Sequence, residues 1–167
     1  MSGAYRSIGI NRNDFMSLVQ MRPEGGAAFG TLEWVAYASN AFNTMVPFYA
    51  DVDETPEYLA NTTGEVSTGN FYWTSRMIAA MADASYGKSL FHVEHYQENV
   101  LAKSHALINQ YDALLADEKD PEKQMELKRK ANRKVAEMVQ KEASATLKKV
   151  LYELSNQMKN SYARSDV

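Results

Sequence analysis

The polar residues best placed for chemistry lie in the N-terminal third of the sequence, beside runs that are otherwise apolar. Asn40 and Asn43 occupy a short polar corner between the runs TLEWVAYAS and TMVPFYADV, and Arg6 lies at the start of YRSIGINR. An Arg at the end of a sheet can bind a carboxylate through two hydrogen bonds. An Asn amide can donate to a developing oxyanion, an effect worth about 3 kcal/mol in other hydrolases. The same residues also have an ordinary interpretation, because Asn is a common turn residue and an Arg at a strand end usually meets solvent.

A nucleophile to accompany these groups is not evident. The 167 residues contain no cysteine, which excludes disulfides, thiolate metal sites and a cysteine nucleophile within this sequence. His92 and His95 stand three apart in HVEH, on neighbouring positions of one helix face. Zinc helices instead use H-E-x-x-H or H-x-x-E-H, and His105 is the only other histidine. We therefore expect packing or exposed histidines and no metal ion.

The basic run Lys128–Lys134, KRKANRK, could attract nucleic acid. Glutamates flank it at spacings that favour pairs within one helix: Glu122, Glu126, Glu137 and Glu142. The pattern predicts a solvated helix face. The net charge of −3 agrees with this interpretation, because a polyphosphate partner calls for a dense basic face.

Length and composition indicate one globular domain. A chain of 167 residues is long enough for one core and too short for two domains. No apolar run approaches the roughly 20 residues of a membrane-spanning helix, and the N-terminus lacks a signal-peptide pattern. We expect a cytoplasmic protein that has neither a membrane nor a nucleic acid as its partner.

Residues 1–52 are the predicted β half, which would position Arg6 and Asn40. Four runs have strand character, separated by an Asn-Asp pair, the loop PEGGAAFG and the Asn-containing corner. The two runs beside Asn40 carry large apolar residues on both faces, which predicts a sheet covered on both sides. Pro47 places its strand at an edge or a bulge.

Residues 53–69 contain turn formers and few apolar residues, so we interpret them as a connecting segment over the surface. The C-terminal helical region, residues 70–167, has helical periodicity. Its first helix begins after Asn70, a predicted N-cap, and is expected to stop at Gly87.

Two long helices follow in this region. One is expected from about Ser89 to Ala116, and the next starts at Asp120-Pro121 and carries an apolar stripe from Val135 to Met158. The sequence thus predicts an α+β domain with about four antiparallel strands, followed by a helical region with two long antiparallel helices.

Several uncommon elements occur in order along the first half: SIGINR, an EW pair, the Asn-containing corner, VPFY and NFYWTSR. In this order they closely resemble the C-terminal part of the dipeptidase A family of bacterial cysteine peptidases, which are N-terminal-nucleophile (Ntn) hydrolases. The resemblance covers most of the chain and weakens in the long terminal helices. It implies a piece of a four-layered αββα sandwich, without a cofactor, from a family whose members run to several hundred residues.

The resemblance also implies a mechanism for the parent enzyme. A cysteine at the N-terminus of the mature catalytic chain attacks the peptide carbonyl, with its own α-amino group as the base. Residue 1 here is Met and no Cys follows, so the chain alone is expected to be inactive. By resemblance, Arg6 takes a supporting role in substrate binding and stabilisation of the intermediate. Asn40 is carried over with it, although its hairpin does not correspond to the oxyanion Asn of the relatives.

Three functions compete at this stage. The first is the C-terminal portion of a dipeptidase, which would bind a dipeptide only together with the N-terminal portion of the same enzyme. The second is a non-catalytic module that self-associates through its sheet edge and helical stripe as a homo-oligomer. The third, a metal-dependent hydrolase, depends on His92 and His95 alone and ranks last.

Overall fold

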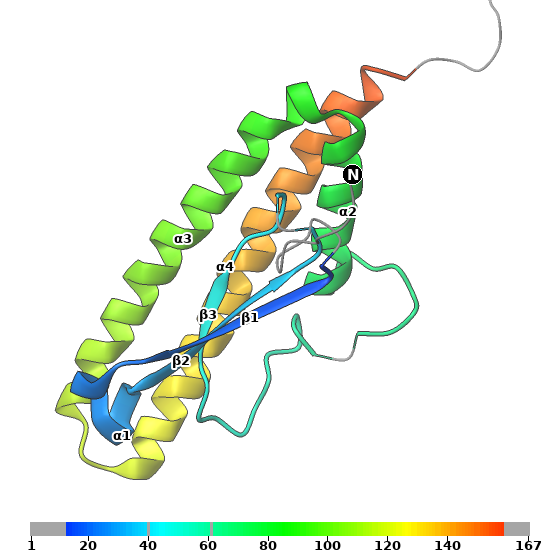
Figure 1. The fold of residues 1–167 in the computed structure, drawn as a ribbon. Helices are drawn as coiled ribbons and strands as arrows, with labels where there is room; N and C mark the ends of the chain where they lie inside the picture. Colours follow the sequence, from blue (N-terminus) through cyan, green and yellow to red (C-terminus); the bar gives the residue numbers. More distant parts are fainter. Residues whose placement is uncertain (1–12, 40, 61, 159–167) are drawn as a thin grey trace, which may run out of the picture.

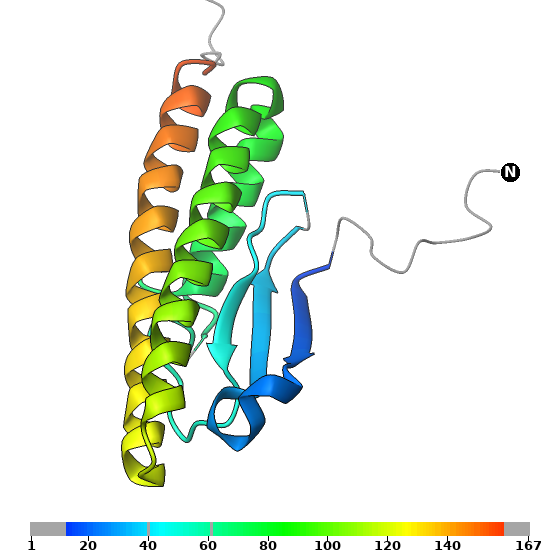
Figure 2. The ribbon, with the colours of Figure 1, turned by 90° about the vertical axis from the view of Figure 1, so that its left-hand side faces the viewer.

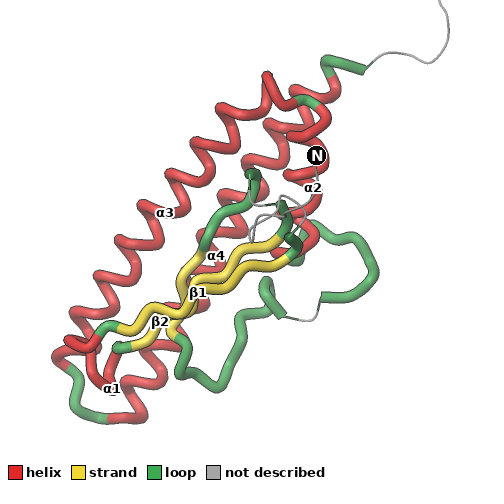
Figure 3. Tube along the Cα trace, viewed as in Figure 1, coloured by secondary structure: helices red, strands yellow, loops and turns green. Residues whose placement is uncertain are grey.

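The computed structural model describes residues 13–39, 41–60 and 62–158, and it has the predicted α+β character (Figures 1 and 3). The elements of this part of the chain are, in order, β1 (Phe15–Met21), η1 (Pro23–Gly25), α1 (Gly26–Phe29), β2 (Thr31–Tyr37), β3 (Val46–Tyr49), α2 (Phe71–Ala84), α3 (Tyr86–Asp117) and α4 (Pro121–Ser155). The two long helices α3 and α4 run antiparallel, as expected from the sequence.

Three of the four expected strands fall within the described residues. They form one antiparallel sheet in the order β1-β2-β3. β1 pairs with β2 from Phe15 opposite Tyr37 to Met21 opposite Thr31, and β3 pairs with the middle of β2. The run YRSIGINR, the other expected strand, lies outside the described residues.

The sheet stands with one edge against the helices, so its strands lie at different depths. Figure 2 shows β3 next to the helices, β2 beyond it and β1 farthest away. All four residues of β3 are buried, β2 mixes buried and half-buried residues, and six of the seven β1 residues are exposed. The exposed β1 side chains include Phe15, Leu18, Val19 and Met21. β1 is therefore an apolar strand that the described part of the chain leaves uncovered.

The helices cover both faces of β2 and β3, as predicted for these two runs. Successive side chains of a strand point to opposite faces, and each face has its own apolar cluster. On one face, Leu32 and Tyr49 belong to a cluster with Ile108, Tyr111 and Leu115 of α3. This cluster packs the end of α3 and the start of α4 against the sheet.

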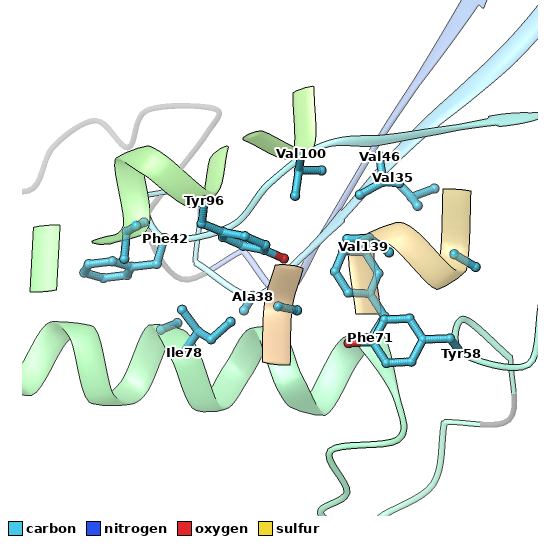
Figure 4. Close-up of a cluster of buried hydrophobic side chains, with 14 of the residues drawn as sticks. Val35, Ala38, Phe42, Val46, Tyr58, Phe71, Ile78, Tyr96, Val100 and Val139 are labelled. Atoms are coloured by element: carbon cyan, nitrogen blue, oxygen red, sulfur yellow. The ribbon is translucent and has the colours of Figure 1, made fainter. Parts of the chain in front are cut away.

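The opposite face belongs to a larger cluster, shown in Figure 4. Val35 and Val46 of the sheet share it with Phe71 of α2 and Val139 of α4. Tyr58, which is 5% exposed, joins them from the connecting segment, and its carbonyl accepts from the backbone N–H of Phe71 at 2.8 Å. Residues 53–60 and 62–69 contain no helix or strand, as expected, but this part of the chain also contributes to the core.

A side chain of α4 completes the edge of β3 that faces the helices. The Oδ1 atom of Asn132 accepts from the backbone N–H of Tyr49 at 2.8 Å, and its Nδ2 donates to the Tyr49 carbonyl at 3.0 Å. Asn132 is 2% exposed, so this amide replaces a neighbouring strand at a buried edge. Pro47 lies in the same edge strand, where a residue without an N–H removes no ladder bond.

The helix boundaries follow their caps. The Asn70 side chain accepts from the Trp73 N–H, so the predicted N-cap is confirmed. α4 starts at Pro121, as predicted, and the Asp120 side chain caps it by accepting from the Glu122 N–H. Gly87 was expected to end the first helix, and that expectation is wrong: α2 ends at Ala84, and Gly87 lies in the first turn of α3. The chain bends instead at Ser85, a residue with φ −131° and ψ 40°. Within the described residues, no helix has the length and apolar character needed to cross a membrane.

Replacing Asn132 with Ala should destabilise the chain strongly. The change leaves the N–H and C=O of Tyr49 buried without partners, and each lost buried hydrogen bond costs about 1–3 kcal/mol. We expect the free energy of unfolding, measured with urea, to fall by about 2–5 kcal/mol. Gln140→Ala, at an exposed position of the same helix, is the matched control and should change stability little. Equal effects of the two substitutions would contradict a specific role for Asn132.

Candidate functional site

A cleft of about 680 Å³ lies where β1 begins and β2 ends, beside α2. The sheet side of the cleft is formed by Asn13, Asp14, Ala38, Ser39 and Phe42. Its other wall is one face of α2, and Val66 of the connecting segment also contributes to the lining. The volume lies in the range of small-molecule sites.

The α2 wall follows from helical periodicity. Trp73, Arg76, Ala80 and Asp83 recur at steps of three or four residues and therefore lie on one side of the helix. The residues on the other side of α2 include Ile78, which is fully buried in the large apolar cluster. One face of α2 thus packs in the core, and the other presents a cation and an anion to the cleft.

The charged residues of the cleft are only partly paired. Arg76 Nη1 donates to Asp14 Oδ1, and the Arg76 guanidinium lies 5.7 Å from the centre of the Tyr72 ring. The Arg76 side chain is 41% exposed and that of Asp14 62%, so solvent screens the pair. Within the described residues, Asp83 forms no side-chain hydrogen bond or ion pair. The cleft therefore holds charges that remain accessible to a ligand.

The Asn-containing corner is held by its second Asn. Asn43 is buried, and its Nδ2 donates to the Ala38 carbonyl at 3.1 Å. The backbone carbonyl of Asn43 accepts from Gln97 of α3 at 2.7 Å. Ala38 has φ +68°, a conformation that costs a non-glycine residue about 1–2 kcal/mol. Asn43 thus stabilises a strained turn, and it does not itself line the cleft.

Arg6 and Asn40, the two predicted site residues, lie outside the described residues. Their neighbours in the sequence do line the cleft: Ser39 directly precedes Asn40, and Asn13 follows Arg6 by seven positions. The supporting catalytic roles assigned to Arg6 and Asn40 therefore remain predictions. Sequence reasoning missed Arg76 and Asp83, although their spacing of seven on one helix was a usable signal.

The histidines do not line the cleft, and each of them contacts a different neighbouring side chain. His92 is 3.4 Å from Glu153 of α4, and His95 stacks on Phe91. His105 packs against Trp34 of β2. Among the described residues there is no group of three or more His, Cys, Asp or Glu side chains that could hold a metal ion.

The basic run of α4 holds part of the connecting region in place. Asp51, Asp53 and Glu54, which we call the acidic turn, bind Lys128, Arg129 and Arg133 respectively. Nε and Nη2 of Arg129 each donate to Asp53 at 2.7 Å, a bidentate pair. The predicted pairs within the helix also form, between Glu126 and both arginines. The sequence interpretation missed the acidic turn, because its partners are distant along the chain.

A set of polar side chains at the other end of the sheet has a structural role. Arg22 binds Asp112 of α3 at 2.6 Å, and the hydroxyl of Tyr49 donates to Asp112 at 2.8 Å. Burial, followed by the hydrogen bond to Asp112, raises the pKa of Tyr49 well above its usual value. Tyr49 therefore stays protonated and is unsuited to act as a base. This group of side chains joins β3 and α3 to Arg22, the residue that directly follows β1.

The cleft can bind a ligand but offers little for covalent chemistry. Its described lining contains one hydroxyl, Ser39, and no His or Lys side chain that could activate it. The cleft presents one guanidinium, two carboxylates and apolar walls. Such a set fits recognition of a small charged ligand.

Comparisons with known proteins agree with the resemblance. The model of peptidase family C69 matches residues 2–99. A probable dipeptidase A from Streptococcus pyogenes serotype M18 is 41% identical over 164 residues, which is 97% of this chain and 33% of that protein. A dipeptidase from Bifidobacterium longum is 34% identical over 97% of this chain and 37% of its own length. A probable dipeptidase B from Lactococcus lactis is 32% identical over 65% of this chain and 23% of its own length. The chain spans about a third of the length of the first two relatives.

Asn43→Ala should reduce stability and loosen the corner. The Ala38 carbonyl would lose its buried donor, with a cost of about 1–3 kcal/mol, while the strained φ of Ala38 remains. We expect a fall of that size in the free energy of unfolding and faster amide exchange at residues 41–45. Asn109→Ala, an exposed Asn on α3, should leave both quantities unchanged. An unperturbed corner in Asn43→Ala would refute the structural assignment.

Acid should release the acidic turn from α4. The hydrogen bond from Arg129 lowers the pKa of Asp53, and those from Arg133 and then Arg129 lower the pKa of Glu126. Because both folded-state pKa values are lowered, the contribution is complete above the unfolded-state values near 4. It is lost as the pH falls through the lowered values. Hydrogen exchange at residues 51–55, corrected for intrinsic rates, should therefore accelerate as the pH falls below about 4.

Arg129→Gln provides the control for this acid effect. The variant should exchange rapidly at residues 51–55 already at pH 6, with little further acceleration on acidification. An acid response of the same size in wild type and Arg129→Gln would show that other groups control the segment.

Proposed function

We propose, from the premise that the chain belongs to peptidase family C69, that it is the C-terminal portion of an Ntn-type dipeptidase. Its relatives by sequence are dipeptidases, so the reaction class is peptide-bond hydrolysis. The observation that carries the narrower proposal is the extent of the match. Nearly the whole chain aligns with about one third of each of two longer dipeptidases.

In the proposed enzyme the nucleophile belongs to the other portion. The thiolate of an N-terminal Cys attacks the peptide carbonyl carbon, and the α-amino group of that Cys accepts the thiol proton. The C–N bond then breaks, the leaving amine takes up this proton, and water hydrolyses the thioester to release the acid. These 167 residues contain no Cys, so within this scheme they bind and position the substrate.

Two residues of this chain are assigned supporting roles in the scheme. Arg6 is proposed to bind the substrate and stabilise the tetrahedral intermediate, because its segment resembles the Arg-bearing strand of related acylases. Asn40 is proposed as a weaker contributor to the same two roles. Ser39 and Asn13, near them in the sequence, line the cleft, which supports placing the substrate there.

The exposed apolar side chains of β1 support the proposal that a further layer covers this strand in the whole enzyme. Phe15, Leu18, Val19 and Met21 are between 52% and 80% exposed, and the described chain offers no strand beyond β1. An apolar strand with an unpaired edge ordinarily pairs or is covered. We propose that the N-terminal portion of the same enzyme covers it, as the second sheet of an αββα sandwich. Self-association of this chain through β1 is the alternative occupant.

Complementation tests the proposal directly. The purified chain should not hydrolyse dipeptides, and adding the separately produced first two thirds of the Streptococcus pyogenes relative should generate activity. Arg6→Ala should lower the kcat/KM of the complemented enzyme by about 100-fold or more, the scale of one lost transition-state donor. Met21→Ser and Leu18→Ser on β1 should weaken assembly without changing kcat once the complex has formed.

Two outcomes would count against the proposal. Turnover of a dipeptide by the isolated chain would show that the external thiol is not required. A folded chain that forms a stable homodimer through β1, and that never complements, would instead identify a self-associating module.

A further inference from the structure

We propose that α2 binds both ends of the substrate, with Arg76 binding the carboxylate end and Asp83 the ammonium end of a zwitterionic dipeptide. This inference rests on the proposed function, because it takes the substrate class from there. Its structural basis is independent of Arg6 and Asn40. It uses the two charged residues of α2 that face the same cleft.

Arg76 has hydrogen-bond donors to spare. One of its terminal nitrogens, Nη1, donates to Asp14, whereas Nη2 and Nε have no partner among the described residues. The guanidinium lies over the Tyr72 ring, an aromatic neighbour that favours a fixed cation. A carboxylate can therefore bind the free edge of Arg76 through two parallel bonds while Asp14 stays in place.

The two charges of α2 can reach opposite ends of a dipeptide. Seven positions separate Arg76 from Asp83, which corresponds to about 10.5 Å along the axis of α2. The Arg76 guanidinium lies over the ring of Tyr72, one turn farther from Asp83, which extends the gap between the charged groups. Two extended residues span about 7 Å, and a hydrogen bond of about 3 Å at each end gives about 13 Å in all.

The surface between the charges leaves room for the substrate. Ala80 lies one turn beyond Arg76 and one turn before Asp83, and it is exposed in the cleft. A small residue at this position permits the substrate backbone to lie close to the helix. Met77 and Phe42 supply apolar surface nearby for a substrate side chain.

The charge balance of the cleft also favours a zwitterion. Arg76 contributes one positive charge, and Asp14 and Asp83 contribute two negative charges. A peptide with a blocked amine would bring a net negative charge to this acidic surface and would leave Asp83 without a partner. A binding site rejects a ligand more strongly when one of its polar groups is left unpaired than when only apolar contact is lost.

The test pairs changes in the protein with matching changes in the ligand. Alanylalanine, its C-terminal amide and N-acetyl-alanylalanine are titrated against the 167-residue chain and followed by NMR shifts of α2. Arg76→Gln should weaken alanylalanine binding about tenfold, the equivalent of about 1.4 kcal/mol, and leave the amide's affinity unchanged. Asp83→Asn should weaken alanylalanine by a similar factor and leave the N-acetyl peptide unchanged. Lys88→Gln and Asp117→Asn, at exposed sites on α3, are the matched charge controls.

Failure of the inference is distinguishable from failure of the proposed function. Equal loss of all three ligands, no loss in either variant, or no binding of alanylalanine to the chain would overturn the proposed binding of both termini. The complemented enzyme gives the second readout, in which both variants should raise KM for alanylalanine and leave kcat within about twofold. Ligand-selective binding to the chain without any complementation would retain the role of α2 and discard the dipeptidase proposal.

Discussion

The fold depends on how one buried strand edge is closed. β3 is the strand deepest in the protein, yet it has a neighbouring strand on only one side. The amide of Asn132 accepts from and donates to the backbone of Tyr49 on the other side, so that no backbone group of Tyr49 is buried without a partner. Because these bonds come from α4, they fix the β3 edge of the sheet against that helix.

The edge-on arrangement determines where the cleft lies. With β3 innermost, both faces of β2 and β3 receive helices, and β1 extends away from them (Figure 2). α2 packs beside one face at the end of the sheet where β1 begins and β2 ends, and the cleft forms between these three elements. The turn from Ala38 to Asn43 bounds the cleft, and its strained backbone is stabilised by the amide of Asn43 and by Gln97 of α3. The scaffold therefore holds the walls of the cleft through Asn43 and Gln97, which do not themselves line it.

Local patterns predicted much of this structure, and long-range partners set the rest. The α+β class, the long helices and the edge strand were predicted from local features. These were the period-2 runs, the Asn70 N-cap, the helix start at Asp120-Pro121 and the position of Pro47, each of which depends on near neighbours in sequence. Asn132 read as one polar residue of a solvated helix, since its partner Tyr49 is 83 positions away. The acidic turn, the core role of Tyr58 and the pairing of Arg76 with Asp14 were missed for the same reason. The proposed roles of Arg6 and Asn40 come from resemblance, and the described residues leave them as predictions.

The contribution of α4 also bears on what the family match means physically. The match to peptidase family C69 ends at residue 99, within α3, and therefore before α4 begins. Yet α4 supplies Asn132 to the edge of β3, Val135 and Val139 to the large cluster, and the cations that bind the acidic turn. The matched residues alone would leave β3 with an unpaired edge and without the apolar residues that α4 and the second half of α3 contribute. The Streptococcus pyogenes relative aligns over 97% of this chain and so extends well beyond the family match. Since the cost of an open buried edge applies to any chain with this sheet, the helical extension is best understood as part of the folding unit that builds the cleft.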